Sequence, residues 1–168
     1  MKQLLFFVLI VSLVSCDHFR AATSQEKTYD TATVKRNISN ALDSMHMAFK
    51  SRNINSMLSY LADDGKYLGT DPTEIWTKQQ FGENIAKMFA DSANIDYTVG
   101  DRIIMVDDDG KSAIVVEQFL YNSLSSKIQV RGVGRTDFKD GKWLIDFYSW
   151  NLIPKNEDLK KLNDALDH

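Results

Sequence analysis

The side chains best suited to acid–base chemistry in this sequence are its three histidines, and only His46 falls inside a predicted helix. His18 lies near the N-terminus and His168 is the last residue, so the three do not have the spacing of a zinc site. His46 stands beside Leu42 and Phe49 at the edge of an apolar stripe. A catalytic histidine needs a partner within hydrogen-bond reach, and the sequence shows none. His46 is therefore a candidate base, or else a structural histidine at the boundary of the core.

Two aspartates are further candidates for this chemistry. Asp71 opens the segment Asp71-Pro72-Thr73-Glu74, where its carboxylate would lie near the mouth of a pocket that Tyr67 also borders. The alternative is that Asp71 and Glu74 organise the turn and the following helix start through local hydrogen bonds. Asp101 falls toward one end of the predicted sheet. None of these residues forms a complete catalytic arrangement in the sequence.

Several classes of site are excluded by what the sequence lacks. It has no glycine-rich phosphate loop, no metal-binding motif and no Ser-His-Asp arrangement. Cys16 is the only cysteine, so no intramolecular disulfide, cysteine-based metal cluster or catalytic thiol is available. We expect no metal and no cofactor. The chain has 20 Lys+Arg against 23 Asp+Glu and no basic run, which argues against nucleic acid as a partner.

The N-terminal segment predicts a secreted, membrane-anchored protein. A short basic start precedes the apolar run from Leu4 to Val14, which fits a signal peptide over 1–15 and is too short to span a bilayer. Leu13-Val14-Ser15-Cys16 resembles the lipobox of bacterial lipoproteins, which implies lipid attachment at Cys16 after cleavage. The alternative is an ordinary signal peptide with an incidental cysteine. Residues 16–32 are polar and read as a flexible tether, and we expect a cell-envelope location.

The remaining chain predicts one α+β domain, because helical periodicity comes first and strand periodicity follows. The Asp-Gly pairs at 109–110 and 140–141 indicate tight hairpins. The expected elements are helices over 34–50, about 54–61 and 77–90, a short strand over 66–69, strands over 95–106, 112–121, 127–138 and 143–153, and a last helix within 155–168.

The segment Tyr67-Leu-Gly-Thr-Asp-Pro-Thr-Glu-Ile-Trp-Thr-Lys-Gln-Gln-Phe81 resembles the hallmark segment of SnoaL-like domains, in the nuclear transport factor 2-like superfamily. The resemblance covers roughly residues 33–154. It implies a cone-like fold with N-terminal helices packed on a curved, mainly antiparallel sheet. Ser149 matches the serine that closes the family's last strand. Many relatives have a histidine two residues earlier, where this chain has Phe147. The fold hosts both enzymes and binding proteins, so the resemblance does not fix an activity.

The hairpins predict which strand residues face one another. Arg102 should lie opposite Glu117, and a turn centred on Leu124 would place Glu117 opposite Arg131 as a charge pair. One face then carries the set that we assign to the convex side and, by resemblance to dimeric relatives, to a homodimer interface. This set is Arg102, Glu117, Arg131, Tyr148 and Trp150.

The opposite face, which carries Phe147, Val116, Trp143 and Ile103, is assigned to the helices and to the floor of a pocket. The candidate ligand-binding residues are Tyr67, Trp76, Gln118, Phe147, Ser149 and His46. Such a lining favours a small, mostly apolar ligand held by neutral hydrogen bonds.

Two functions remain open. The first is a membrane-tethered domain that binds a small apolar ligand or a protein partner without catalysis. The second is a cofactor-free enzyme of isomerase, dehydratase or hydrolase type, acting on a small apolar or polyketide-like substrate through His46, Asp71 or Asp101. A histidine or carboxylate inside the cavity, within hydrogen-bond reach of a second titratable group, would favour the enzyme. A cavity with only Gln118 and Ser149 as polar groups would favour binding.

Overall fold

The computed structural model describes residues 29–91 and 95–167 of the chain. The predicted signal peptide and Cys16 lie outside these residues. In chain order the elements are α1 (Thr31–Lys50), α2 (Ile54–Leu58), β1 (Leu61–Leu68), β2 (Ile75–Trp76), α3 (Lys78–Ala90), β3 (Tyr97–Val106), β4 (Ser112–Tyr121), β5 (Gln129–Lys139), β6 (Lys142–Ile153), a short 3-10 turn (Asn156–Asp158) and α4 (Leu159–Leu166).

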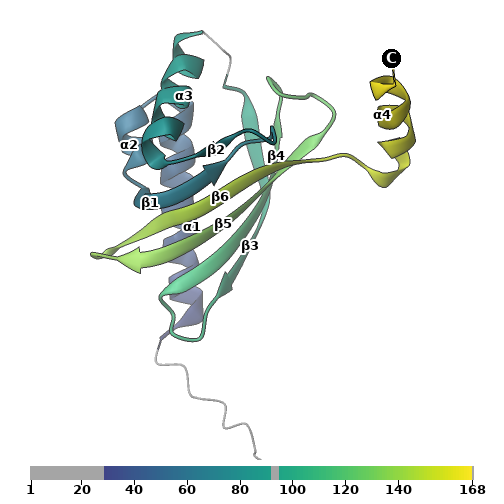
Figure 1. Cartoon of the computed structure of the whole chain (residues 1–168). Coiled ribbons are helices and arrows are strands. Elements are labelled where there is room, and N and C mark those ends of the chain that lie inside the picture. The colour runs from purple at the N-terminus through teal and green to yellow at the C-terminus, as the bar shows by residue number, and fades with distance from the viewer. Residues whose placement is uncertain (1–28, 92–94, 168) are drawn as a thin grey trace, which may run out of the picture.

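Six strands form one mixed sheet in the order β2-β1-β6-β5-β4-β3. All neighbouring pairs are antiparallel except β1 and β6, which run parallel. The sheet is curved, and α1, α2 and α3 lie on one side of it, while α4 projects away from the body of the domain (Figure 1). The predicted α+β fold of helices packed on a curved, mainly antiparallel sheet is confirmed.

Local sequence explains where the two long helices begin. Asp30 caps α1, because its carboxylate accepts hydrogen bonds from the backbone N–H groups of Ala32 and Thr33. α1 therefore starts a few residues earlier than the apolar periodicity indicated. Thr77 and Gln80 form a reciprocal capping box at the start of α3. The apolar stripe of α1 is buried against the sheet.

The hairpin registers are partly as predicted. Arg102 pairs with Glu117 across β3 and β4, and Phe138 pairs with Trp143 across the turn in which Asp140 and Gly141 both have positive φ. The prediction that Glu117 pairs with Arg131 is wrong: Glu117 lies opposite Gly132. The β4–β5 connection is not centred on Leu124, because the N–H groups of Leu124 and Ser125 both donate to the Tyr121 carbonyl in a helix-like turn.

This one-residue difference, together with a bulge in β6, corrects the predicted faces. A register slip of one residue exchanges the two sides of a strand. The pairing between β5 and β6 shifts after Arg135, so that Trp143, Ile145 and Tyr148 all turn toward the helices. The row formed by Arg102, Glu117, Gly132 and Trp150 therefore lies on the concave, helix-covered side.

Arg131 is exposed on the outer side of the sheet, as predicted, but the other four residues of the predicted convex interface lie on the helix side. Glu117 is 0% exposed and Tyr148 is 2% exposed. The outer side of the sheet instead carries Ile103, Met105 and Phe147, which are 58%, 50% and 37% exposed. The prediction that Phe147 and Ile103 form the floor of a pocket on the helix side is therefore wrong. The assignment of Trp143 to the helix side is correct, since it is buried in the core.

Candidate functional site

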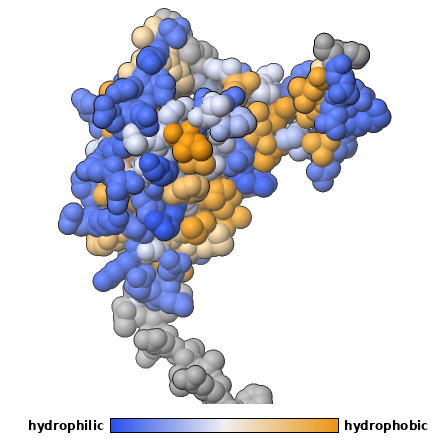
Figure 2. Space-filling model, in the orientation of Figure 1, coloured by the Kyte–Doolittle hydropathy of each residue, from blue (hydrophilic) through white to orange (hydrophobic). Residues whose placement is uncertain are grey.

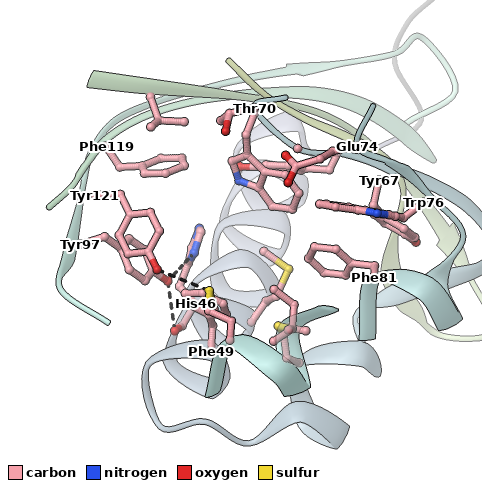
Figure 3. Close-up of a pocket in the computed structure, with 18 of the residues that line it drawn as sticks. His46, Phe49, Tyr67, Thr70, Glu74, Trp76, Phe81, Tyr97, Phe119 and Tyr121 are labelled. Atoms are coloured by element: carbon pink, nitrogen blue, oxygen red, sulfur yellow. Dashed lines mark hydrogen bonds between the residues drawn. The ribbon is translucent and has the colours of Figure 1, made fainter. Parts of the chain in front are cut away.

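A cavity of about 240 Å³ lies between α1, α2 and α3 and the concave side of the sheet. Its walls are mainly apolar and rich in aromatic side chains. The aromatic lining residues are Phe49, Tyr67, Trp76, Phe81, Tyr97, Phe119, Tyr121, Tyr148 and Trp150. Figure 3 shows Tyr67, Trp76 and Phe81 at one end of this space, and His46, Tyr97 and Tyr121 at the other.

The first end is a packed stack of rings. Phe81 lies between Tyr67 and Trp150, with ring centroids 5.4 Å from each. The Tyr67 hydroxyl donates to backbone carbonyls of Ala62 and Ile145, and the residue is 0% exposed. Tyr67 therefore supplies a fixed wall of the cavity, while its hydroxyl is used within the fold.

The opposite end contains a histidine with a partner on each ring nitrogen. His46 Nδ1 lies 2.8 Å from the Tyr97 hydroxyl, and Nε2 lies 3.1 Å from both carboxylate oxygens of Glu117. The Tyr97 hydroxyl is also 3.2 Å from the carbonyl oxygen of His46 itself. α1 supplies the histidine, β3 the tyrosine and β4 the glutamate, so three separate elements meet here.

Glu117 is a buried carboxylate with several donors. Arg102 Nε donates to Oε1 at 2.8 Å, and the Tyr148 hydroxyl donates to Oε2 at 2.7 Å. Burial by itself raises the pKa of Glu117, but hydrogen bonds from His46 and Tyr148 and the charges of His46 and Arg102 outweigh it and lower the pKa to about 2. The carboxylate is thus ionised at neutral pH.

Arg102 links this group to α1. Its guanidinium donates to Asp43 Oδ1 at 2.8 Å and to the carbonyl oxygen of Ser39 at 3.2 Å. The side chain of Arg102 is 12% exposed. Arg102 was predicted to lie on an exposed convex surface, and it instead ties the helix to the buried carboxylate.

The Tyr97 hydroxyl keeps its proton at neutral pH. Burial, followed by the negative charge of Glu117, raises the pKa of Tyr97. The Tyr121 hydroxyl lies beside Met88 Sδ at 3.5 Å, and a thioether sulfur is a weak acceptor. Of the described lining residues, His46, Tyr97 and Tyr121 thus form the polar end of the cavity.

The other polar lining groups lie in the loop between β1 and β2. Thr70 and Glu74 line the cavity from this loop (Figure 3). The Glu74 carboxylate accepts from the Asp71 N–H at 3.0 Å, and Asp71 accepts from the N–H and hydroxyl of Thr73. The structure therefore shows Asp71 and Glu74 in the local turn contacts that were the alternative to a catalytic role, with Asp71 on the outside.

Of the predicted ligand-binding residues, the structure brings His46, Tyr67 and Trp76 to the cavity. It does not bring Gln118, Phe147 or Ser149 there, because all three lie on the outer side of the sheet. Asp101 is exposed beside the irregularity in β3. The prediction that these four side chains face the helices is wrong.

Sequence reasoning missed Tyr97 and Tyr121 as site residues, and it assigned Glu117 to a dimer interface and not to the neighbourhood of His46. One signal was present for Glu117: on its side of β4 stand Ala113, Val115 and Phe119, all of them buried. A single carboxylate in a row of small and apolar residues indicates a buried charge with a specific partner. Within residues 29–91 and 95–167 no cluster of histidine and carboxylate side chains is arranged to hold a metal ion, and no helix is long and apolar enough to cross a membrane.

Solved structures of other proteins show the fold to which this chain belongs. An NTF2-like protein from Cytophaga hutchinsonii matches with a TM-score of 0.58 and 18% identity, over 74% of this chain and 100% of that chain. A domain of unknown function with a cystatin-like fold from Nostoc punctiforme matches with a TM-score of 0.64 and 11% identity, over 83% of this chain and 89% of that chain. At this identity the likeness shows the NTF2-like fold alone.

The sequence supplies the narrower assignment. Residues 38–149 match the family described as the SnoaL-like domain, which is more than half of the chain. The chain belongs to the SnoaL-like domain family. A putative calcium/calmodulin dependent protein kinase II association domain from Xanthomonas campestris is similar in structure, with 24% identity, a TM-score of 0.59, and coverage of 71% of this chain and 88% of that chain. The comparison with curated proteins gave no match.

Proposed function

We propose that this SnoaL-like domain binds a small, mostly apolar molecule in the cavity between its helices and its sheet. The observation that carries the proposal is a cavity with an aromatic-rich lining, polar groups at one end and two more polar side chains from the loop between β1 and β2. Ligand pockets in proteins combine these two features. The cavity volume of about 240 Å³ is close to the lower limit of about 300 Å³ for such pockets, and a dry cavity of roughly 150 Å³ already takes benzene. A molecule with one or two rings is therefore the expected size.

The binding experiment uses thermal shift and calorimetry with benzyl alcohol, indole and acetophenone as probes. A matched pair of variants separates cavity binding from surface effects. Met88→Trp fills the cavity, whereas Met47→Trp makes the same change at a position of α1 that is 69% exposed. Met88→Trp should abolish binding and Met47→Trp should leave it unchanged. If both variants bind the probes equally well, the cavity is not the binding site. Native mass spectrometry of protein purified from its own envelope then identifies any retained ligand.

A second candidate function is the cofactor-free enzyme. It is favoured by one observation: His46 lines the cavity and lies within hydrogen-bond reach of two titratable side chains, Tyr97 and Glu117. This is the geometry that distinguishes an acid–base site from a plain pocket.

The proposed setting of this domain is the cell envelope, where a lipid on Cys16 would hold it to a membrane. The support is the coincidence of an apolar run with a lipobox-like sequence. In the Cys16→Ser variant, lipid attachment should fail and the protein should leave the membrane fraction. The comparison to make is with Ser15→Ala, which keeps the cysteine. Membrane fractionation that is unchanged by Cys16→Ser would refute the anchor.

We also propose that the domain forms a homodimer. Its interface would be the outer side of the sheet, in place of the residue set predicted from the sequence. Met105, Ile114, Arg135 and Phe147 are successive cross-strand neighbours on that side. Figure 2 shows hydrophobic side chains gathered on the outer side of the sheet and on the side of α4 that is turned toward it. A second copy of the chain would cover both. Analytical ultracentrifugation should show dimers that Met105→Asp dissociates, while Lys142→Asp, at the end of the sheet, has no effect.

A further inference from the structure

The hairpin of β1 and β2 places a carboxylate at the border of the cavity. Tyr67 pairs with Trp76 across the two strands, and the Gly69 N–H donates to the carbonyl oxygen of Glu74 at 2.9 Å. Glu74 and Trp76 both line the cavity, whereas Ile75 between them is 62% exposed, in keeping with the alternation of side chains along a strand. The cavity side of this hairpin therefore carries one acid among aromatic rings.

The carboxylate of Glu74 is held in place without being neutralised. Its Oε2 accepts from the Asp71 N–H at 3.0 Å, which fixes the side chain across the loop. Gly69 leaves the space for it, because a Cβ atom at that position would overlap the carboxylate. Among the described residues, no basic side chain forms an ion pair with Glu74, and none donates to its Oε1. One oxygen is thus left for a ligand.

The charge balance around the cavity favours a cation at this carboxylate. No lysine or arginine is among the described lining residues. The buried carboxylate of Glu117, behind the opposite end, already has a histidine, an arginine and a tyrosine as donors. A positive group that enters the cavity therefore finds its free acceptor at Glu74, and a negative group would be repelled there.

The surroundings of Glu74 suit a charged group that is joined to a ring. Residues 71–73 of the same loop are exposed, so a cation at Glu74 keeps part of its hydration and loses less solvation energy than it would in the core. Figure 3 shows Thr70 and Glu74 on the same border of the cavity, between Phe119 and Trp76. An attached ring can therefore enter the aromatic-rich interior while the charge stays at the loop.

We propose that the cavity takes a primary arylalkylamine in its protonated form, with the ammonium group at Glu74 and the ring among the aromatic walls. This inference names a ligand class for the cavity binding proposed above and rests on it. A primary ammonium group has three N–H donors. Glu74 Oε1 accepts one, the Thr70 hydroxyl accepts a second, and the third remains with water at the exposed loop. A quaternary ammonium group has the same charge but no donor, so it should bind more weakly.

The experiment compares three probes of similar shape by calorimetry on the full chain: phenethylamine, its neutral analogue 2-phenylethanol, and the quaternary (2-phenylethyl)trimethylammonium ion. The wild-type protein should bind the amine about 10-fold or more tighter than the alcohol, the effect of one charge-assisted hydrogen bond. Glu74→Gln should bring these two affinities close together, and its amide oxygen can still accept from the Asp71 N–H. Glu83→Gln, an exposed change of the same kind on α3, should keep the wild-type ratio.

Proton NMR of the complex gives the orientation of the bound amine. The methylene group next to the nitrogen should show contacts with Thr70 and Trp76, and not with Tyr97 at the other end. Three results would each overturn the amine site: equal binding of amine and alcohol, a preference for the amine that survives Glu74→Gln, or quaternary binding as tight as that of the primary amine. A nitrogen-bearing methylene against Tyr97 would also overturn it. Binding of 2-phenylethanol would in each case leave the cavity proposal standing, whereas no binding of any probe would overturn both.

Discussion

The hydroxyl of Tyr148 on β6 reaches across β5 to Glu117 on β4 and donates to Oε2 at 2.7 Å. The two residues are not neighbours in the sheet, because β5 lies between their strands. The contact exists because β5 has Gly132 and Gly134 at the crossing point, where a Cβ atom would lie 2.2 Å from the Tyr148 hydroxyl and 2.6 Å from its ring. Because Gly132 and Gly134 have no side chains, the Tyr148 ring fits over β5 and its hydroxyl reaches the buried carboxylate.

The first prediction concerns this crossing. Gly132→Ala should destabilise the protein by about 1–3 kcal/mol, because the added methyl group overpacks the space that Tyr148 fills. The measurement is urea unfolding. The same substitution in a Tyr148→Leu background should cost less, since the ring that it strikes is gone. Equal costs in the two backgrounds would show that Gly132 acts through the strand itself and not through Tyr148.

The second prediction concerns acid stability. The folded-state pKa of Glu117, about 2, lies below its ordinary value of 4.5. The ionised carboxylate therefore contributes stability above about pH 4.5, and this contribution is lost as the pH falls from about 4.5 toward 2. Urea unfolding at a series of pH values should show this loss in the wild type.

Glu117→Gln is the matched variant for that experiment. It should be less stable at neutral pH by about 3–5 kcal/mol, because Arg102 loses its buried counter-charge. Its free energy of unfolding should also fall less than that of the wild type between about pH 4.5 and 2, because it has no carboxylate at position 117 to protonate. Wild-type and variant curves that run parallel through this pH range would contradict the assignment.

The third prediction tests how far the helices cover the last hairpin, whose two aromatic partners lie on the same side of the sheet. Trp143 is 8% exposed and its cross-strand partner Phe138 is 46% exposed. Trp143→Ala should cost about 3–5 kcal/mol of unfolding free energy, the usual penalty for removing a buried aromatic side chain. Phe138→Ala should cost clearly less, since its ring remains largely in water. A larger penalty at Phe138 would contradict the burial of Trp143.

The fourth prediction concerns ligand charge. Glu74 is the only carboxylate among the described lining residues, and it lies beside aromatic rings. A ring compound with an amino group should therefore bind better than its carboxylate analogue, which benzylamine and benzoate test by calorimetry. Glu74→Gln should reduce the difference in affinity between benzylamine and benzoate. Glu83→Gln, an exposed change of the same kind on α3, should leave it intact. Tighter binding of benzoate by the wild type would contradict this reading.

The sequence by itself determined the fold class and most element boundaries. Periodicity and turn residues act over a few positions, so Thr77 at the start of α3 and the Asp140-Gly141 turn were readable without any partner. The register of Arg102 with Glu117 followed in the same way from the short turn between their strands. The segment from Tyr67 to Phe81 sufficed for a family resemblance that the comparison of residues 38–149 confirms.

Only the tertiary structure decided what the two sides of the sheet do. Glu117 and Tyr148 lie on the opposite face from Phe147, as predicted, but the register at Gly132 and the bulge near Asp146 group them with other residues of β5 and β6 than expected. The helices cover the face of Glu117 and Tyr148, which are buried, and not the face of Phe147. A surface ion pair in the predicted register contributes little energy, whereas burying Glu117 requires donors from His46, Arg102 and Tyr148 at once. Those donors come from three elements far apart in the chain. Their meeting depends on how the curved sheet closes around α1, and no local pattern in the sequence encodes that closure.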